Sequence, residues 1–166
     1  MKISIEDIKS ATGDFNEKNL IGSGAYGMVY KAQLDNSDNE KSAGIQGTNK
    51  GEIPKRRSTV AVKRISNRQD GQGEEGFFME IKTLTSCKHP NIISLLGFCD
   101  AGSEKILVYE HAYHGSLENY LENINEKTNL TWSQRLEICL DVAQGLNYLH
   151  GNMEDKERII HRDIKS

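Results

Sequence analysis

The 166-residue sequence contains only three cysteines, at positions 87, 99 and 139. They are odd in number, far apart and outside any C-x-x-C spacing, so they indicate neither a disulfide framework nor a zinc site. We expect them to be reduced, buried side chains. The sequence also lacks any apolar run near the ~20 residues that a membrane span requires. Its acidic start, residues 1–7, is unlike a signal peptide.

An excess of charge of one sign is also missing. The formal net charge is −3, with 27% charged and 36% hydrophobic residues. This balance gives no reason to expect nucleic acid or an anionic membrane surface as a partner. The length fits one domain that can bury a core. We therefore expect a soluble, cytoplasmic chain without a transmembrane segment.

A G-x-G-x-x-G pattern is present at residues 22–27. Dinucleotide-binding folds share it, but in a Rossmann unit the glycines open a helix. Here residues 28–34 alternate and are rich in strand formers, which predicts a strand after Gly27 and disfavours a Rossmann oxidoreductase. Bare glycines let backbone N–H groups approach phosphate oxygens. Taken by itself, this stretch is also compatible with a purely structural hairpin turn.

A lysine and a glutamate follow the glycine pattern in a suggestive order. Residues 60–63 read V-A-V-K in a short predicted strand that ends in Lys63. Residues 75–84 repeat apolar side chains at helical spacing, with Glu80 beside them. A helical glutamate can reach back to a strand lysine and hold its ammonium group toward phosphates. The order of the three elements is much more specific than any one of them.

The remaining elements follow from caps, breakers and periodicity. A polar run at residues 35–58 predicts a flexible insert between two strands. Three further helices are predicted. The first spans residues 5–12, with Ser4 at its start and Gly13 at its end. The second spans 117–123 and is capped by Ser116, and the third spans 132–150 and begins with the capping box Thr131–Gln134. Buried strands are expected after Pro90 and at residues 106–110, and residues 111–115 read as a linker.

The final stretch, residues 159–166, contains His-Arg-Asp followed by a lysine two places after Asp163. In the catalytic loop of protein kinases, the aspartate of this motif accepts the proton of the substrate hydroxyl.

Taken together and in order, these motifs resemble the catalytic domain of eukaryotic protein kinases, in particular the plant receptor-like and Pelle-type serine/threonine group. The resemblance implies an α+β, protein-kinase-like fold. It would contain a five-stranded antiparallel N-lobe sheet with one helix, followed by only the first helices of the C-lobe. The implied domains are a lead-in helix at 1–19, the N-lobe at 20–110 with its flexible insert at 35–58, and the hinge with an incomplete C-lobe at 111–166.

The resemblance also implies residue roles. The glycine loop would cover the phosphates, Lys63 would be paired by Glu80, and Asp163 would be the base. Lys165, a lysine at the position where serine/threonine kinases carry one, would neutralise the γ-phosphate. The backbones of Glu110 and Ala112 would bond adenine, and Ser116 sits where family members contact ribose. The implied ATP-binding residues are Ile21, Gly22, Ser23, Gly24, Ala25, Tyr26, Gly27, Val29, Ala61, Lys63, Tyr109, Glu110, Ala112 and Ser116.

The implied reaction is in-line transfer of the ATP γ-phosphoryl group to a serine or threonine hydroxyl of a protein, with Mg²⁺ bridging the phosphates. The usual magnesium ligands would fall after Ser166, so we expect no metal ligand within the chain and weak catalysis by the chain alone. Membrane association is expected only in a receptor context, at the cytosolic face of the plasma membrane. The alternative is a non-catalytic kinase fragment that binds nucleotide or competes for a kinase's partners.

Overall fold

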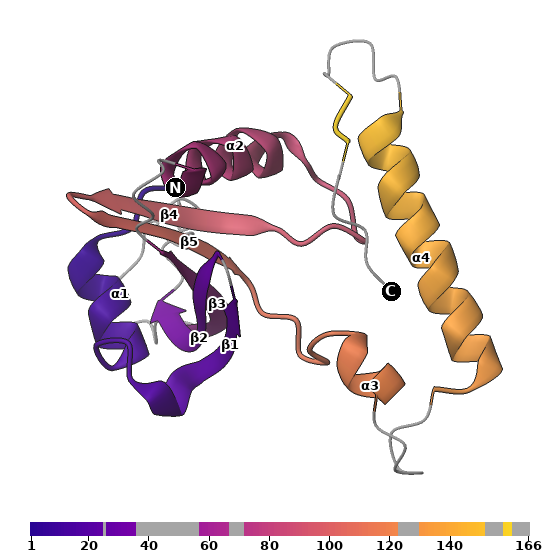
Figure 1. The fold of residues 1–166 in the computed structure, drawn as a ribbon, viewed down its shortest axis with the longest axis horizontal. Coiled ribbons are helices and arrows are strands. Elements are labelled where there is room, and N and C mark those ends of the chain that lie inside the picture. The colour runs from indigo at the N-terminus through magenta and orange to yellow at the C-terminus, as the bar shows by residue number, and fades with distance from the viewer. Residues whose placement is uncertain (25, 36–56, 67–71, 123–129, 152–157, 161–166) are drawn as a thin grey trace, which may run out of the picture. The chain divides into compact units, whose positions relative to one another are not determined.

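The computed structural model describes residues 1–24, 26–35, 57–66, 72–122, 130–151 and 158–160. Figure 1 shows their helices and strands. The chain forms two compact units, and each is described by itself. The first contains Met1–Phe78 with Leu95–His111, and the second contains Met79–Ser94 with Ala112–Ser166. In order, the elements are α1 (Ile5–Thr12), η1 (Glu17–Asn19), β1 (Leu20–Gly24), β2 (Gly27–Asp35), β3 (Arg57–Ile65), α2 (Gln72–Ser86), β4 (Leu95–Ala101), β5 (Glu104–Glu110), α3 (Glu118–Glu122) and α4 (Trp132–His150).

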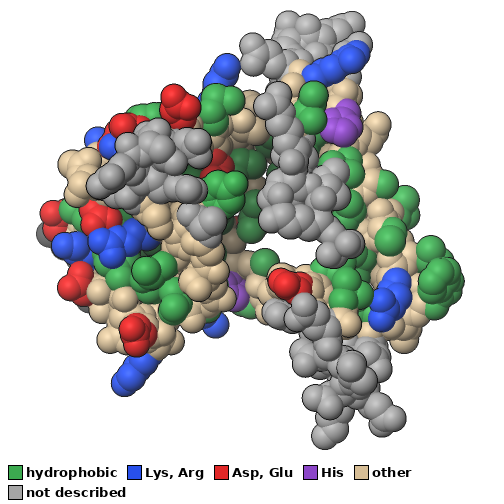
Figure 2. All heavy atoms as spheres, in the orientation of Figure 1, with side chains coloured by type: hydrophobic (Ala, Val, Ile, Leu, Met, Phe, Trp, Pro, Cys, Tyr) green, Lys and Arg blue, Asp and Glu red, His purple; other side chains and the backbone are tan. Residues whose placement is uncertain are grey.

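In the second unit, α4 confirms the strongest helix prediction. The Thr131 hydroxyl accepts a hydrogen bond from the Gln134 N–H (3.3 Å), and the Gln134 side-chain oxygen accepts one from the Thr131 N–H (2.9 Å). The apolar side of α4 is exposed: Trp132 is 74% and Leu140 58% accessible. Figure 2 shows hydrophobic side chains at the surface along α4. Of the three cysteines expected to be buried, Cys99 is buried, Cys87 is only partly buried, and Cys139 is exposed on α4.

The start of α3 differs from the prediction. The helix begins at Glu118, and the Leu117 carbonyl accepts its first hydrogen bonds, from Tyr120 and Leu121. Leu117, not Ser116, therefore precedes the helix as its capping residue. The turn that precedes it closes with a bond from the Gly115 N–H to the Ala112 carbonyl (3.1 Å), and Gly115 has φ +69°.

The first unit is built on a five-stranded antiparallel sheet in the order β1-β2-β3-β5-β4. This confirms the predicted α+β class and agrees with the N-lobe of the protein kinase fold. Strands β2 and β3 run farther than predicted, to a pair between Asp35 and Arg57. The rest of the predicted insert, residues 36–56, lies outside the described residues.

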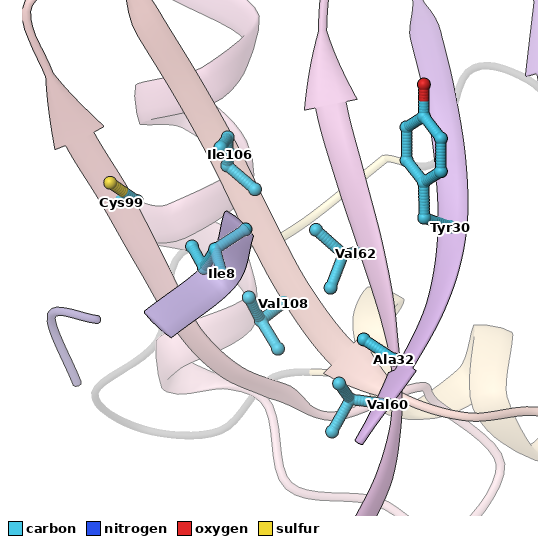
Figure 3. Packing of buried hydrophobic residues seen from close by; sticks show 8 residues of the cluster. All are labelled: Ile8, Tyr30, Ala32, Val60, Val62, Cys99, Ile106 and Val108. Atoms are coloured by element: carbon cyan, nitrogen blue, oxygen red, sulfur yellow. The ribbon is translucent and has the colours of Figure 1, made fainter. Parts of the chain in front are cut away.

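Helix α1 covers one face of the sheet. As predicted, the Ser4 hydroxyl accepts a hydrogen bond from the Asp7 N–H (3.0 Å), and Gly13 ends the helix in the left-handed conformation. Ile8 is fully buried against the sheet. Figure 3 shows the resulting core. Its buried members are Ile8, Tyr30, Ala32, Val60, Val62, Cys99, Ile106 and Val108.

The opposite face carries the first turns of α2. Phe77 is 1% exposed, and its ring packs edge-on against Phe98 at a centroid distance of 6.2 Å. The Lys105 Nζ lies 2.8 Å from an Asp100 carboxylate oxygen and 3.4 Å from one of Glu74. The helix predicted around residues 75–84, with a start expected near residues 70–73, is confirmed and runs from Gln72 to Ser86.

None of the described helices is both long and apolar enough to cross a bilayer.

Candidate functional site

The glycine pattern forms the turn of a β-hairpin. Strand β1 ends at Gly24 and β2 begins at Gly27, and these two residues face each other across the pair. Ala25 lies outside the described residues. Because a strand and not a helix follows the last glycine, the dinucleotide-binding interpretation fails on the criterion that separates the two folds.

The three glycines of the hairpin have different reasons to be glycine. Gly27 has φ +132°, and a Cβ there would overlap with the Arg64 carbonyl oxygen of the neighbouring strand. The fold itself therefore requires Gly27. A Cβ on Gly22 would make an ordinary 3.8 Å contact with Val29, and one on Gly24 would meet nothing within 4 Å. The packing of the described residues thus has no need for glycine at positions 22 and 24.

Four of the predicted site residues share the sheet face opposite α1. Val29 of β2 is directly paired with Lys63 of β3, and Ala61 is paired with Tyr109 of β5. Paired residues of antiparallel strands point to the same side, as do residues two apart on one strand. The alternate residues of β3, Val60 and Val62, point into the core under α1. The structure therefore brings Val29, Ala61, Lys63 and Tyr109 together on one surface beside the glycine hairpin.

Other predicted residues of the first unit lie less centrally. Ile21 is 51% exposed, at an irregularity in the pairing of β1. Tyr26, in the hairpin turn, is 69% exposed. Ser23 is paired with Met28, so its side chain belongs to the α1 side of the sheet. Glu110 ends β5 and is paired with Val60, which also directs its side chain toward that side.

The remaining predicted residues belong to the second unit or lie outside the described residues. Glu80 lies on α2, and Ala112 and Ser116 lie in the exposed stretch before α3. Asp163 and Lys165 fall outside the described residues. The pairing of Lys63 with Glu80 and the roles of Asp163 and Lys165 therefore stay predictions. Among the residues that the structure describes, no cluster of three or more His, Cys, Asp or Glu side chains is arranged to hold a metal.

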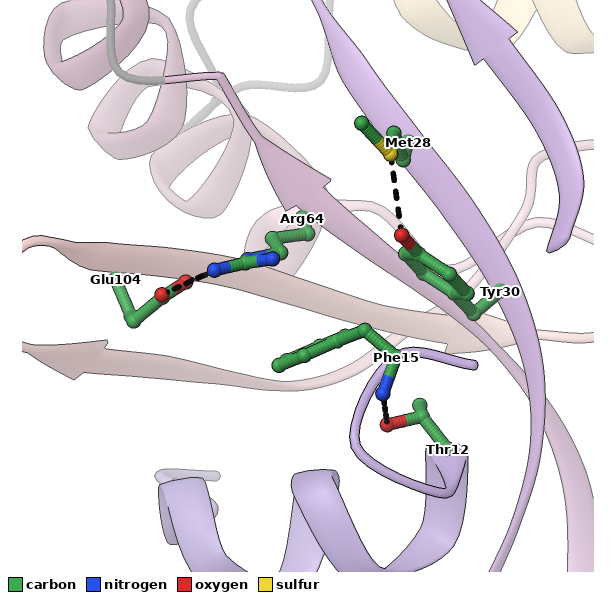
Figure 4. Close-up of polar contacts among 6 residues, drawn as sticks. All are labelled: Thr12, Phe15, Met28, Tyr30, Arg64 and Glu104. Atoms are coloured by element: carbon green, nitrogen blue, oxygen red, sulfur yellow. Dashed lines mark hydrogen bonds and ion pairs between the residues drawn. The ribbon is translucent and has the colours of Figure 1, made fainter. Parts of the chain in front are cut away.

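Sequence reasoning missed a polar cluster on the α1 side of the sheet (Figure 4). We call Phe15, Arg64 and Glu104 the Arg64 cluster. The Arg64 guanidinium donates two hydrogen bonds to the Glu104 carboxylate (2.8 and 2.5 Å), and its Cζ lies 4.4 Å from the centre of the Phe15 ring. The hydrogen bond to Glu104 raises the pKa of Arg64, and the same bond lowers the pKa of Glu104.

One signal for this cluster was present in the sequence. Alternation along a strand puts Arg64 opposite to Lys63, on the side of the lead-in helix. No local pattern points to Glu104, which is forty residues away in the chain.

Comparison with known proteins agrees with this geometry. The family described as protein tyrosine and serine/threonine kinase matches residues 15–166. The chain belongs to the protein kinase family.

Relatives of this kinase chain are plant receptor kinases. The leucine-rich repeat receptor protein kinase EMS1 of Arabidopsis thaliana is 41% identical over 167 residues, which cover 100% of this chain and 12% of EMS1. The receptor-like protein kinase ANXUR1 of the same plant is 39% identical over 165 residues, covering 99% of this chain and 17% of ANXUR1. FERONIA, also from Arabidopsis thaliana, is 37% identical over 163 residues, covering 98% and 16%. The kinase chain thus spans less than a fifth of the length of these relatives.

Proposed function

We propose that this chain supplies the ATP-binding lobe of a receptor-like protein serine/threonine kinase. The observation that carries the proposal is the surface formed by Val29, Ala61, Lys63 and Tyr109, next to a hairpin whose first two glycines are not required by packing. A surface of apolar side chains next to the Lys63 ammonium group and a glycine hairpin suits a purine with a phosphate chain.

Each residue would have a distinct task. Val29 and Ala61, together with Ile21, would pack against adenine, and Tyr109 would close the back of the pocket. The backbones of Glu110 and Ala112 would bond the edge of the base, and Ser116 would contact ribose. Backbone N–H groups at Gly22 and Gly24 would approach the phosphates, because no Cβ stands in the way there.

Charge would be handled by a small set of side chains. Lys63 would hold the α- and β-phosphates, with its ammonium oriented by Glu80. Asp163 would accept the proton of a serine or threonine hydroxyl as it attacks, and Lys165 would offset negative charge on the transferred group. Bound Mg²⁺ would neutralise the phosphates, with its usual ligands expected outside this chain. Protein serine or threonine side chains are accordingly the proposed acceptors, and the cytosol or the cytosolic face of the plasma membrane is the proposed location.

Nucleotide binding is the first property to test. Calorimetric titration of the 166-residue chain with ATP, with and without Mg²⁺, should show binding, and Lys63→Ala should weaken it about 10- to 100-fold through the loss of charge-assisted hydrogen bonds. Lys31→Ala is a matched control, since Lys31 is exposed and lies on the same sheet face, paired with Ala61. It should bind ATP like the wild type. An equal loss of ATP affinity in both variants would mean that Lys63 contributes only through its charge and not through a specific contact, which would contradict the proposed site.

Catalysis requires a separate measurement. Transfer of labelled phosphate from ATP to serine- and threonine-containing peptides, compared with tyrosine-containing ones, tests both activity and acceptor type. Loss of transfer in Asp163→Asn with unchanged ATP affinity would support the assigned base. Tight, Lys63-dependent ATP binding without any transfer would instead favour the non-catalytic alternative.

A further inference from the structure

We propose that Arg64 is a positioning residue for the glycine hairpin and Lys63, and that the N-terminal segment, residues 1–19, acts on the nucleotide site through it. The proposal rests on the proposed ATP site. It concerns the opposite face of the sheet, where no nucleotide contact is assigned.

The N-terminal segment is bound to the sheet at two places. Its first residues run parallel to the edge strand β4, with hydrogen bonds from the Ile3 N–H to the Phe98 carbonyl (2.8 Å) and from the Phe98 N–H to the Met1 carbonyl (3.0 Å). Ile8 of α1 is fully buried in the core. The segment is therefore an integral part of the first unit.

A strained turn then aims Phe15 at Arg64. Gly13, Asp14 and Phe15 all have positive φ, of 62°, 55° and 58°. Two consecutive non-glycine residues in this conformation persist only where the surroundings hold them. The holding group is Thr12, which is fully buried: its hydroxyl donates to the Ile8 carbonyl (2.8 Å) and accepts from the Phe15 N–H (3.1 Å).

Phe15 and Glu104 together fix the Arg64 side chain. The ring packs edge-on against Tyr30 at 5.5 Å, and the guanidinium lies over the ring at 4.4 Å while both of its bonds go to Glu104. A planar guanidinium with a bidentate carboxylate and an aromatic partner has little rotational freedom. The end of β3 is thereby held by residues from α1's turn and from β5.

The turn end of the glycine hairpin packs directly against the backbone of Arg64. Gly27 lies so close to the Arg64 carbonyl oxygen that no Cβ fits, and Met28 is the direct pairing partner of Arg64. The next residues continue this anchoring, with a hydrogen bond from the Ser66 N–H to the Tyr26 carbonyl (3.4 Å). Lys63 is separated from Arg64 by a single peptide. Any displacement of Arg64 therefore reaches both groups that would contact phosphate.

The same strand provides an internal comparison. Arg57, at the other end of β3, also forms an ion pair, with Asp35 at 3.3 Å, but it is 73% exposed. It is paired with the far end of β2, away from the hairpin glycines. If an arginine on β3 only stabilised the sheet, its substitution would have a similar effect on nucleotide binding at either end of the strand. A positioning role predicts that only Arg64 affects nucleotide binding.

The experiment compares the affinities for ATP and for adenosine, which has no phosphates, in the 166-residue chain. The variants are Arg64→Met, Arg64→Lys, Phe15→Leu, the double variant Phe15→Leu/Arg64→Met, and the control Arg57→Met. We expect Arg64→Met and Phe15→Leu to weaken ATP binding about three- to tenfold, as for coupling through packed side chains. The loss of adenosine affinity should be smaller because, of the hairpin residues, only Ile21 and Val29 would contact adenine. Arg64→Lys keeps the charge but cannot form the bidentate bond, so it should restore only a small part of the loss. The double variant should lose less than the product of the two single effects.

Amide hydrogen exchange gives a second readout that does not require tight binding. In Arg64→Met and Phe15→Leu, the amides of Met28 and Val29 should exchange faster than in the wild type, while amides of the β4–β5 pair keep their protection. The milder Phe15→Leu keeps this comparison usable if Arg64→Met folds poorly.

Several results would overturn the inference. These are wild-type ATP affinity in Arg64→Met, a parallel loss of ATP and adenosine binding, fully additive effects in the double variant, or an equal effect of Arg57→Met. ATP binding that depends on Lys63 but not on Arg64 would remove this inference alone. ATP binding that is indifferent to Lys63 would remove the proposed function together with it.

Discussion

Substituting alanine for Gly27 should strongly destabilise the folded chain, whereas the same substitution at Gly24 should leave its stability almost unchanged. Gly27→Ala places a Cβ on a residue with φ +132° and against the Arg64 carbonyl oxygen. The unfavourable φ costs roughly 1–3 kcal/mol, and the shift of backbone needed to relieve the overlap costs about the same. Together the free energy of unfolding should fall by about 2–6 kcal/mol. This is a large part of the stability of an ordinary domain, about 5–15 kcal/mol.

Gly24→Ala is the matched comparison. Among the described residues, no atom lies within 4 Å of the added methyl group, and Gly24 is not in the left-handed region. Its unfolding free energy should stay within about 0.5 kcal/mol of the wild type. If the proposed site is right, this stable variant should nevertheless bind ATP more weakly, because the methyl group would stand between the backbone and the phosphates.

Urea denaturation followed by circular dichroism measures both effects. With a slope of about 1–3 kcal/mol per molar urea, the midpoint of Gly27→Ala should fall by roughly 1–3 M, and that of Gly24→Ala should not move detectably. Equal midpoints for the two variants would refute the close approach of Gly27 to β3. A large loss in Gly24→Ala would show that its glycine is needed for folding after all, and would remove the packing argument for a phosphate-binding role.

Three further predictions concern the first unit. Ile8→Ala should lower the free energy of unfolding by about 2–5 kcal/mol, measured by urea titration, because Ile8 is fully buried, whereas the exposed neighbour Lys9→Ala should change it little. Because Arg64 lowers the pKa of Glu104, ionised Glu104 stabilises the folded chain above the ordinary glutamate pKa of about 4.3, and this contribution disappears as the pH falls through the lowered value. Glu104→Gln should therefore be less stable than the wild type at pH 7, with a difference that shrinks in acid; a constant difference down to pH 3 would contradict this. Gly97→Ala should release residues 1–3 from β4, since its Cβ would lie 2.7 Å from the Met1 carbonyl oxygen, and the Ile3 amide should then exchange faster.

Features that depend on neighbouring residues could be predicted from the sequence. The cap of α1 by Ser4, the capping box of α4 and the strand after Gly27 all follow from side chains within a few positions of the backbone groups they satisfy. The exposure of Cys139 could not be predicted, because periodicity defines a helix face without saying what covers it.

The candidate site likewise has features that could be predicted from the sequence and features that could not. Alternation along β3 predicts that Ala61 and Lys63 share a face. Which residues of β2 and β5 join them depends on strand register, and the register also decides that Glu104 meets Arg64. Register is set by burial along whole strands and not by a local motif. Residues that recognise one another only through register, as in the Arg64 cluster, are therefore those that sequence reasoning misses.

The position of β3 restricts how the two faces of the sheet can influence each other. It lies between β2 and β5 and is hydrogen-bonded on both sides, so it cannot move as a whole without disturbing two ladders. The hairpin of β1 and β2 is at the edge of the sheet, where a change in strand twist disturbs only one ladder. Loosening Arg64 should thus alter the hairpin before it alters the packing of Ala61 or Tyr109. For this reason an effect of the N-terminal segment should appear mainly at the phosphate end of a nucleotide and less at its base.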